Sequence, residues 1–322
     1  MKKRLLAAGG TLAAAIALVG CSNDAEPGSA NDGADGGRYT YAVITHAAPG
    51  DAFWDRVKSG AERAGDDYGS TIVYNGDPDP AKQSQLIDNA IAQDVDGIVV
   101  SMANPDGLKS SIERAVAEGI PVVTINSGME RSKEFGAITH IGQSEAVAGA
   151  AVGDRLADEG KKRVICVVHE AGNVGLEERC SSAKAAFGGA LENVQVDGTN
   201  DAEVKNTLRA KLQSDSGIDG VLTLGGQYAI DAVGAVEESG SSADVVTFDL
   251  SSDVIAQIKK GAVGFAVDQQ PYVQGFLGVS ALYLDSVNGN QIGGGEPIYS
   301  GPAFVTKENA EAVEKFAENG TR

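Results

Sequence analysis

Short runs of consecutive apolar residues recur along the chain, separated by longer stretches in which apolar residues return every three or four positions. Continuous runs indicate strands that are buried on both faces, and the longer stretches, such as 53–68 and 108–116, indicate amphipathic helices. Strands that alternate with helices predict an α/β fold with parallel sheets flanked by helices. The runs are Tyr41–Ile44, Gly97–Val100, Val122–Ile125, Val164–Val168, Val221–Leu224 and Val245–Phe248.

The two halves of this pattern repeat each other at an offset of 123 residues. Four matches at one offset are hard to obtain by chance, so the sequence predicts two similar Rossmann-like lobes. The matched positions are Asp96–Val99 with Asp219–Leu222, Val122–Asn126 with Val245–Asp249, His46 with His169, and Arg56 with Arg179.

Polar residues follow the matched strands at the positions where ligands bind in open α/β sheets, the carboxyl ends of the strands. Asn126 and Asp249 correspond to each other in the repeat, as do His46 and His169. In two lobes that face each other, these pairs would lie on opposite sides of a cleft. Asn or Asp after a strand is also an ordinary turn or capping residue. The symmetry of the pair favours ligand contact.

The charge composition excludes some classes of binding partner. The 322 residues carry 45 Asp and Glu against 26 Lys and Arg, a net charge of −19. This excess argues against nucleic acid, and against docking of a basic patch on anionic lipid. Two classes of function remain, an enzyme and a binding protein.

The first 38 residues are predicted to be an export segment. Lys2, Lys3 and Arg4 precede a charge-free stretch from 5 to 20, which is typical of a signal peptide and is short for a membrane span. Leu18-Val19-Gly20-Cys21 resembles the bacterial lipobox, so Cys21 is predicted to be lipidated. Residues 21–38 are rich in Gly, Asp, Asn and Ser and predict a flexible tether. Cleavage before Cys21 removes three positive charges, which changes the net charge from −19 to −22.

Enzyme motifs are lacking. The sequence has no phosphate-binding P-loop and no Gly-x-Ser-x-Gly elbow, and its three histidines are not at metal-ligand spacing. We therefore expect no catalytic residue, no metal site and no cofactor. Cys166 and Cys180 lie in a predicted strand and the helix after it. An exported protein permits a disulfide between them, and two buried thiols are an equal alternative.

These features together resemble the type I periplasmic binding proteins, and within them the ribose, galactose and other simple-sugar substrate-binding proteins of ABC transporters. The resemblance extends from Tyr39 to the C-terminus. It implies a ligand cleft between the lobes and a three-strand hinge, with crossings near Gln143, Gln269 and Tyr299. The implied N-terminal lobe is 39–143 plus 270–298, and the implied C-terminal lobe is 144–269 plus 299–322. The stretches that carry the resemblance are Ala42–His46 with Phe53-Trp54, Asp96–Val100, Gly119–Val123, Thr247–Asp249 and Asp268–Pro271.

The resemblance also implies which residues contact the ligand. Trp54, the only tryptophan, would lie flat on a sugar ring, Asp249 would accept hydrogen bonds from hydroxyls, and Gln269 would donate and accept at the hinge. The chain departs from the ribose-type pattern at Asn126-Ser127 and near Glu177, where charged residues that clamp ribose are replaced. The expected ligand-binding residues are His46, Asp51, Phe53, Trp54, Asn126, Asn173, Arg179, Asp249 and Gln269.

The function implied is that of a monomeric, lipid-anchored component of an ABC importer on the outer face of the cytoplasmic membrane. It would close around a neutral pentose, hexose, sugar alcohol or inositol and deliver it to the permease subunits. One alternative is a ligand-binding sensor for a receptor. Another is a secreted glycoside-processing enzyme in which Asp249 and a second carboxylate act as acid and base.

Overall fold

The computed structural model describes residues 39–322. The predicted signal peptide (1–20), the predicted lipidation site Cys21 and the predicted tether (21–38) lie outside the described residues. Within residues 39–322, no helix combines the length and the apolar character that a membrane span requires.

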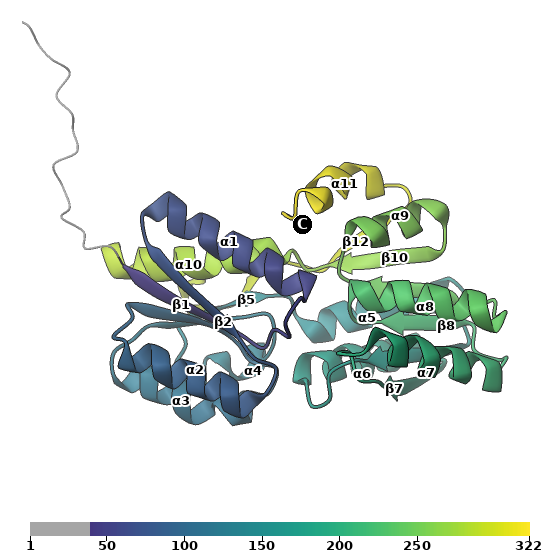
Figure 1. Ribbon diagram of the computed structural model, residues 1–322, viewed down its shortest axis with the longest axis horizontal. Coiled ribbons are helices and arrows are strands. Elements are labelled where there is room, and N and C mark those ends of the chain that lie inside the picture. The colour runs from purple at the N-terminus through teal and green to yellow at the C-terminus, as the bar shows by residue number, and fades with distance from the viewer. Residues whose placement is uncertain (1–38) are drawn as a thin grey trace, which may run out of the picture. The chain divides into compact units, whose positions relative to one another are not determined.

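Two six-stranded sheets organise the described chain (Figure 1). The first has the order β11-β5-β4-β3-β1-β2, and the second has the order β12-β10-β9-β8-β6-β7. The elements around the first sheet are the N-lobe, and those around the second are the C-lobe. The N-lobe strands are Thr40–Thr45 (β1), Thr71–Gly76 (β2), Gly97–Ser101 (β3), Val122–Ile125 (β4), Thr139–Gly142 (β5) and Ile298–Tyr299 (β11). The C-lobe strands are Arg163–Val168 (β6), Ala190–Gln195 (β7), Gly220–Thr223 (β8), Asp244–Phe248 (β9), Val263–Asp268 (β10) and Ala303–Thr306 (β12).

Helices cover both faces of each sheet. The N-lobe helices are Ala52–Tyr68 (α1), Pro80–Ala92 (α2), Pro105–Ala117 (α3), Met129–Ser132 (α4), Pro271–Asn288 (α10) and the short 3₁₀ helix Ile292–Gly295. The C-lobe helices are Glu145–Asp158 (α5), Val174–Phe187 (α6), Asp201–Ser214 (α7), Gly226–Ser239 (α8), Ser252–Lys260 (α9) and Ala310–Glu318 (α11). In the N-lobe, α1 and α10 pack on one face of the sheet, and α2 and α3 pack on the other. In the C-lobe, α5 and α6 correspond to the first pair, and α7 and α8 to the second.

The repeated Asp-Gly motif joins the central strands of each sheet. A carboxylate oxygen of Asp96, just before β3, accepts a hydrogen bond from the backbone N–H of Thr40 at 2.7 Å. The carboxylate of Asp219, just before β8, accepts from the N–H groups of Lys162 and Arg163 at 2.8 Å. Thr40 and Arg163 are themselves 123 residues apart. The Asp of the motif therefore holds two central strands together in each lobe. It joins the start of β1 to β3 in the N-lobe and the start of β6 to β8 in the C-lobe.

Five of the six predicted apolar runs fall within strands, and the sixth, Val221–Leu224, ends one residue beyond β8. The sheets contain further strands that the pattern does not show. The edge strands β2 and β7 are largely exposed or half-buried, so they need no continuous apolar run. The strand β12 pairs with β10 in the antiparallel direction, so the C-lobe sheet is parallel except at this edge.

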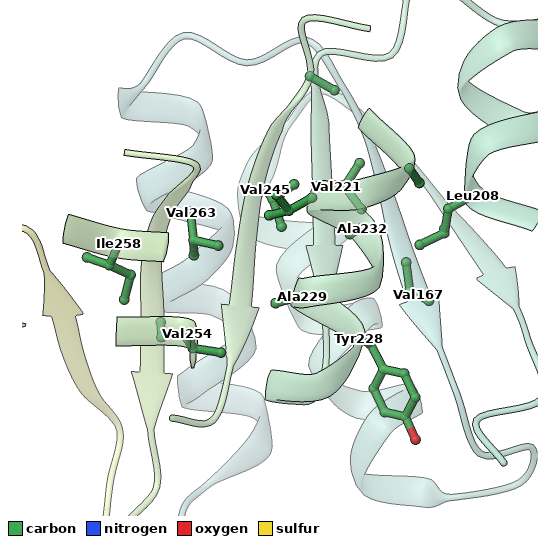
Figure 2. Close-up of a cluster of buried hydrophobic side chains, with 14 of the residues drawn as sticks. Val167, Leu208, Val221, Tyr228, Ala229, Ala232, Val245, Val254, Ile258 and Val263 are labelled. Carbon is green, nitrogen blue, oxygen red and sulfur yellow. The ribbon is translucent and has the colours of Figure 1, made fainter. Parts of the chain in front are cut away.

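The cores confirm why the central runs are apolar on both sides. Figure 2 shows part of the C-lobe core, in which Val167, Val221 and Val245 come from three neighbouring strands. They meet Ala229 and Ala232 of α8. The alternate residues of the same strands face a second cluster beneath α5 and α6.

The chain passes between the two sheets after β5, after β10 and between β11 and β12. The sequence-based boundary placed Tyr299 in the C-terminal lobe, and this assignment is wrong. Tyr299 pairs with Gly142 in the first sheet, because β11 extends through this residue before the chain leaves the N-lobe.

Two helix pairs are packed unusually closely, α1 with α10 and α5 with α6. A Cβ atom on Gly275 of α10 would lie 1.9 Å from the carbonyl oxygen of Val57 in α1. One on Gly149 of α5 would lie 2.4 Å from the carbonyl oxygen of Arg179 in α6. Glycine is required at both positions because the two backbones touch. The helices that follow the first two crossings, α5 and α10, are thus fixed to α6 and α1, which begin at the cleft.

Candidate ligand-binding cleft

A cavity of about 390 Å³ is lined by residues of both lobes at the carboxyl ends of the central strands. All nine residues that the sequence indicated as ligand contacts line it. Their contact with a ligand stays a prediction. The lining residues that the prediction did not include comprise, among others, Arg56, Ser127, His169, Glu170, Thr199, Gln227, Tyr228 and Asp231.

The N-lobe wall is built where β1 leads into α1. Asp51 caps the helix, because its Oδ1 accepts a hydrogen bond from the N–H of Phe53 at 2.8 Å. This cap places Phe53 and Trp54 in the first helical turn, beside the cavity. Trp54 is only 6% exposed, and its ring packs edge-on against His46 with 4.6 Å between centroids. Phe53 packs against Trp54 at 5.0 Å in the same manner.

His46 is held by a neighbouring strand. The Oγ of Ser101, at the end of β3, accepts a hydrogen bond from the backbone N–H of His46 at 3.0 Å and lies 2.7 Å from its Nδ1. The Nε2 of His46 faces the C-lobe, 4.0 Å from Oε2 of Glu170. Burial lowers the pKa of His46, against the opposing effect of Glu170. The imidazole is therefore neutral at pH 7.

Asn126 and Asp249 occupy the same backbone turn in the two lobes. Their φ angles are 63° and 69°, in the left-handed region. Asn and Asp tolerate this region better than other residues with a side chain, which explains why both positions carry one of them. Their N–H groups donate to the carbonyl oxygens of Ile141 and Val267, at 3.1 and 2.8 Å. The turn, rather than a helix cap, places both side chains at the cavity.

Gln269 connects these two side chains across the hinge. Its Oε1 accepts a hydrogen bond from Asn126 Nδ2 at 3.0 Å, and its Nε2 donates to Asp249 Oδ1 at 2.7 Å. Gln274, in the first turn of α10, donates to the backbone carbonyl of Gln269 at 3.0 Å. Gln269 is 1% exposed. A single amide thus joins the matched residues of the N-lobe and the C-lobe.

Arg179 forms a buried ion pair that the sequence did not predict. Its Nε and one terminal nitrogen donate to the two carboxylate oxygens of Glu145 at 2.5 and 2.8 Å. Both side chains are almost fully buried, and the guanidinium also lies 4.7 Å from the ring of Phe248. Glu145 lies 34 residues away on α5, so no local pattern could reveal the pair. The charge of Arg179 is largely balanced inside the protein. Glu177, the departure from the ribose-type pattern, is exposed on the same helix.

Asn173 and Glu170 form the C-lobe loop that faces His46. Asn173 caps α6 through its Oδ1, which accepts from the N–H groups of Gly175 and Leu176 at 3.0 and 3.3 Å. Its Nδ2 donates to Oε2 of Glu170 at 2.8 Å. The cap therefore also holds the carboxylate of Glu170 at the cavity.

His169 and Tyr228 form a second aromatic wall in the C-lobe. Their rings stack with 4.1 Å between centroids, and the hydroxyl of Tyr228 donates to the carbonyl oxygen of Gly198 at 3.1 Å. The Nδ1 of His169 is buried and has no hydrogen-bond partner among residues 39–322. Burial, together with the charge of Arg179, lowers the pKa of His169 to about 3. It therefore presents neutral polar atoms to the cavity.

Three carboxyl groups that line the cavity hold protons more strongly than usual. Burial raises the pKa of Asp249 to about 7, although Arg179 and the hydrogen bond from Gln269 oppose the shift. Burial also raises the pKa of Asp231 to about 6, and it raises the pKa of Asp51. Within the described part of the chain, no cluster of His, Cys, Asp and Glu has the arrangement of a metal site.

Cys166 and Cys180 are joined by a disulfide that links β6 to α6, with 5.9 Å between their Cα atoms. Of the two alternatives left open by the sequence, the structure contains the bonded one. The bond fixes the middle of α6, the helix that Asn173 caps and that carries Arg179, to β6.

Comparison with known proteins assigns this architecture. Residues 41–290 match the sequence profile of the periplasmic binding protein domain. The ribose import binding protein RbsB of Bacillus subtilis is 27% identical over 240 residues, which cover 71% of this chain and 76% of that protein.

Two solved structures extend the comparison. A carbohydrate transporter from Acidothermus cellulolyticus, in complex with myo-inositol, is 45% identical with a TM-score of 0.88 and covers 89% of this chain and 100% of its own. A solute binding protein from Burkholderia graminis, in complex with D-arabinose, is 25% identical with a TM-score of 0.76 and covers 84% and 96% of the two chains.

Proposed function

Because the chain belongs to the periplasmic binding protein family, we propose that it captures a neutral polyhydroxy ligand in the cleft and delivers it to the permease of an ABC importer. The ligand class is a monosaccharide or cyclic polyol, and we favour an inositol. The similarity to the myo-inositol complex supports this preference, since that protein is similar over its whole length.

The observation that carries the proposal is the chemistry of the cavity lining. Hydroxyl groups both donate and accept, so a polyol is matched by a wall that mixes amides, carboxyls and imidazoles. Asn126, Asp249 and His169 provide such groups, and Trp54 adds an aromatic surface suited to the C–H face of a ring. Two arginines line the cavity. The guanidinium of Arg179 is paired with Glu145, and that of Arg56 donates to the backbone carbonyl oxygens of Ala52 and Arg322. An anionic ligand would therefore find the buried guanidinium of Arg179 already paired with a carboxylate.

Contacts between the lobes support hinge closure as the binding step. The N–H of Val174, at the start of α6, donates to the carbonyl oxygen of Ala103 in the N-lobe at 3.0 Å. The bond between Asn126 and Gln269 also links the lobes. A ligand that contacts both walls stabilises the closed arrangement by its better contacts there.

Export and anchoring complete the proposal. Family membership supports export of the chain. The signal-like segment 1–20 and the lipobox ending in Cys21 support attachment through a lipid at Cys21 to the outer face of the cytoplasmic membrane. We expect a monomer that meets its permease in the closed state. The wild type should fractionate with membranes, and a Cys21→Ser variant that still does so would contradict the anchor.

A thermal-shift screen tests the ligand class. The full chain without its signal peptide is melted with inositols, pentoses, hexoses, sugar alcohols and, as matched charged controls, inositol monophosphates and uronic acids. A ligand at 100 times its dissociation constant adds about 2.7 kcal/mol of stability. We expect at least one neutral polyol to raise the melting temperature and the anionic analogues to leave it unchanged. If only anions stabilise the protein, the proposed ligand class is wrong.

A further inference from the structure

The cleft contains an unassigned pair of groups from opposite lobes, His46 and Glu170. Their facing atoms, Nε2 and Oε2, are 4.0 Å apart, which is too far for a direct hydrogen bond. An oxygen atom about 2.8 Å from each would be seated at an angle of about 90° between them. Both residues line the cavity. The gap thus has the dimensions of one bridging hydroxyl.

The direction of hydrogen bonding at this gap is set by Ser101. Its Oγ already accepts from the backbone N–H of His46, so its own proton needs an acceptor. Among residues 39–322 the only partner for that proton is Nδ1 of His46, at 2.7 Å. Nδ1 is then an acceptor, and the ring proton of the neutral imidazole is on Nε2. The opposite tautomer would leave the buried Ser101 hydroxyl without an acceptor and would turn a lone pair of Nε2 toward a carboxylate.

The other side of the gap is an acceptor held in place. One N–H of Asn173 donates to Oε2 of Glu170, and the same asparagine caps α6 through its oxygen. Glu170 is half-buried, so its carboxylate retains lone pairs directed at the cavity. A donor on the N-lobe therefore faces an acceptor on the C-lobe.

We propose that His46 and Glu170 clamp one ligand hydroxyl between the lobes, with His46 donating to it and Glu170 accepting from it, and that Ser101 is the positioning residue that fixes this polarity. The inference rests on the proposed function and adds Glu170 and Ser101 to the groups that determine specificity. The clamp selects a hydroxyl over hydrogen, ether or ketone at one ring position, because only a hydroxyl satisfies a donor and an acceptor at once. It also couples that choice to closure, since neither lobe completes the clamp alone.

Discrimination between analogues tests the role of Glu170. Binding of myo-inositol and of its monodeoxy analogues is measured by calorimetry for the wild type, Glu170→Ala and the matched control Glu177→Ala, whose carboxylate is exposed. If the thermal-shift screen favours another polyol, that polyol and its deoxy analogues replace them. We expect the wild type to bind one analogue about ten- to hundredfold more weakly than the parent. Glu170→Ala should lose this preference for that analogue alone, and the control should keep it.

Other results would separate the two levels of the proposal. If Glu170→Ala weakens all compounds equally, Glu170 has a structural role and the clamp is refuted while the binding function stands. If the wild type binds no neutral polyol, both fail.

The tautomer of His46 gives a test of Ser101 that needs no ligand. The chain has three histidines, so their ring ¹⁵N signals can be assigned by single substitutions. We expect the Nε2–H tautomer for His46 in the wild type and in Ser101→Thr, which keeps the hydroxyl. Ser101→Ala should shift the ring toward a mixture of tautomers. An Nδ1–H signal for His46 in the wild type would overturn the assigned polarity.

Discussion

The raised pKa of Asp249 predicts that ligand affinity depends on pH near neutrality. Its Oδ1 accepts from Gln269, and its second oxygen remains available at the cavity. Burial raises the pKa to about 7. A ligand hydroxyl that donates to this group binds the ionised form better than the protonated form. Affinity should therefore rise as the pH rises through the pKa and reach a plateau above it.

The size of the effect follows from the pKa. With a value of about 7, roughly a tenth of Asp249 is ionised at pH 6 and roughly nine-tenths at pH 8. Affinity should consequently increase about tenfold between these two pH values. At pH 7, binding should release about half a proton per ligand, because the bound ligand favours the carboxylate. His169, whose pKa is lowered to about 3, stays neutral across this range and contributes nothing to the change.

Isothermal titration calorimetry at pH 6, 7 and 8 measures the affinity, and buffers of different ionisation enthalpy report the released protons. The Asp249→Asn variant should bind more weakly and show no pH step. The Asp231→Asn variant is the matched control, since Asp231 also lines the cavity with a pKa of about 6 and should not be needed for the step. An affinity that is constant or falls toward pH 8, or a step that persists in Asp249→Asn, would refute the reasoning.

Three further predictions concern packing and the cleft walls. Gly275→Ala places a methyl group 1.9 Å from a carbonyl oxygen of α1, so it should reduce the free energy of unfolding, measured in urea, by about 1–3 kcal/mol. The control Gly264→Ala, whose methyl group would lie 3.5 Å from its nearest neighbour, should change that free energy little. Glu145→Ala leaves the buried charge of Arg179 unpaired and should cost about 3–5 kcal/mol in the same measurement; a variant as stable as the wild type would contradict a required pair. Trp54→Ala should weaken polyol binding about tenfold in calorimetry, and unchanged affinity would exclude stacking.

The central strands could be predicted from sequence because they are buried on both faces. A run such as Val164–Val168 has no polar residue to interrupt it, and the repeat offset then locates its counterpart in the other lobe. Edge strands lack this signal. In β7 only Leu191 is buried, so its six residues read as an ordinary polar segment. The boundary at Tyr299 was misplaced for a related reason, since β11 has only two residues.

Cleft residues could be predicted from the sequence where their position directly after a strand places them at the cavity. Asn126 and Asp249 follow matched strands, and the sequence alone aligns them. The partner of Arg179 could not be found in this way, because Glu145 reaches it from another helix, α5, 34 residues earlier in the chain. Glu170 and Tyr228 were missed because hydrophobic periodicity does not show which side chains reach the cavity. Glu170 reaches it from the loop after β6, and Tyr228 from the first turn of α8. The left-handed backbone conformation that Asn126 and Asp249 share is seen only in the structure.

The three crossings also determine when the chain can fold during synthesis. The N-lobe core around β1 and α1 includes Val279 and Leu282 of α10, and the edge strand of its sheet ends at Tyr299. Most of the protein must therefore leave the ribosome before the lobe that begins first can be completed. Until then Gly60, on α1, has no backbone of α10 to pack against. The C-lobe, by contrast, already has β6–β10 and α5–α9 in the nascent chain before α10 can complete the N-lobe.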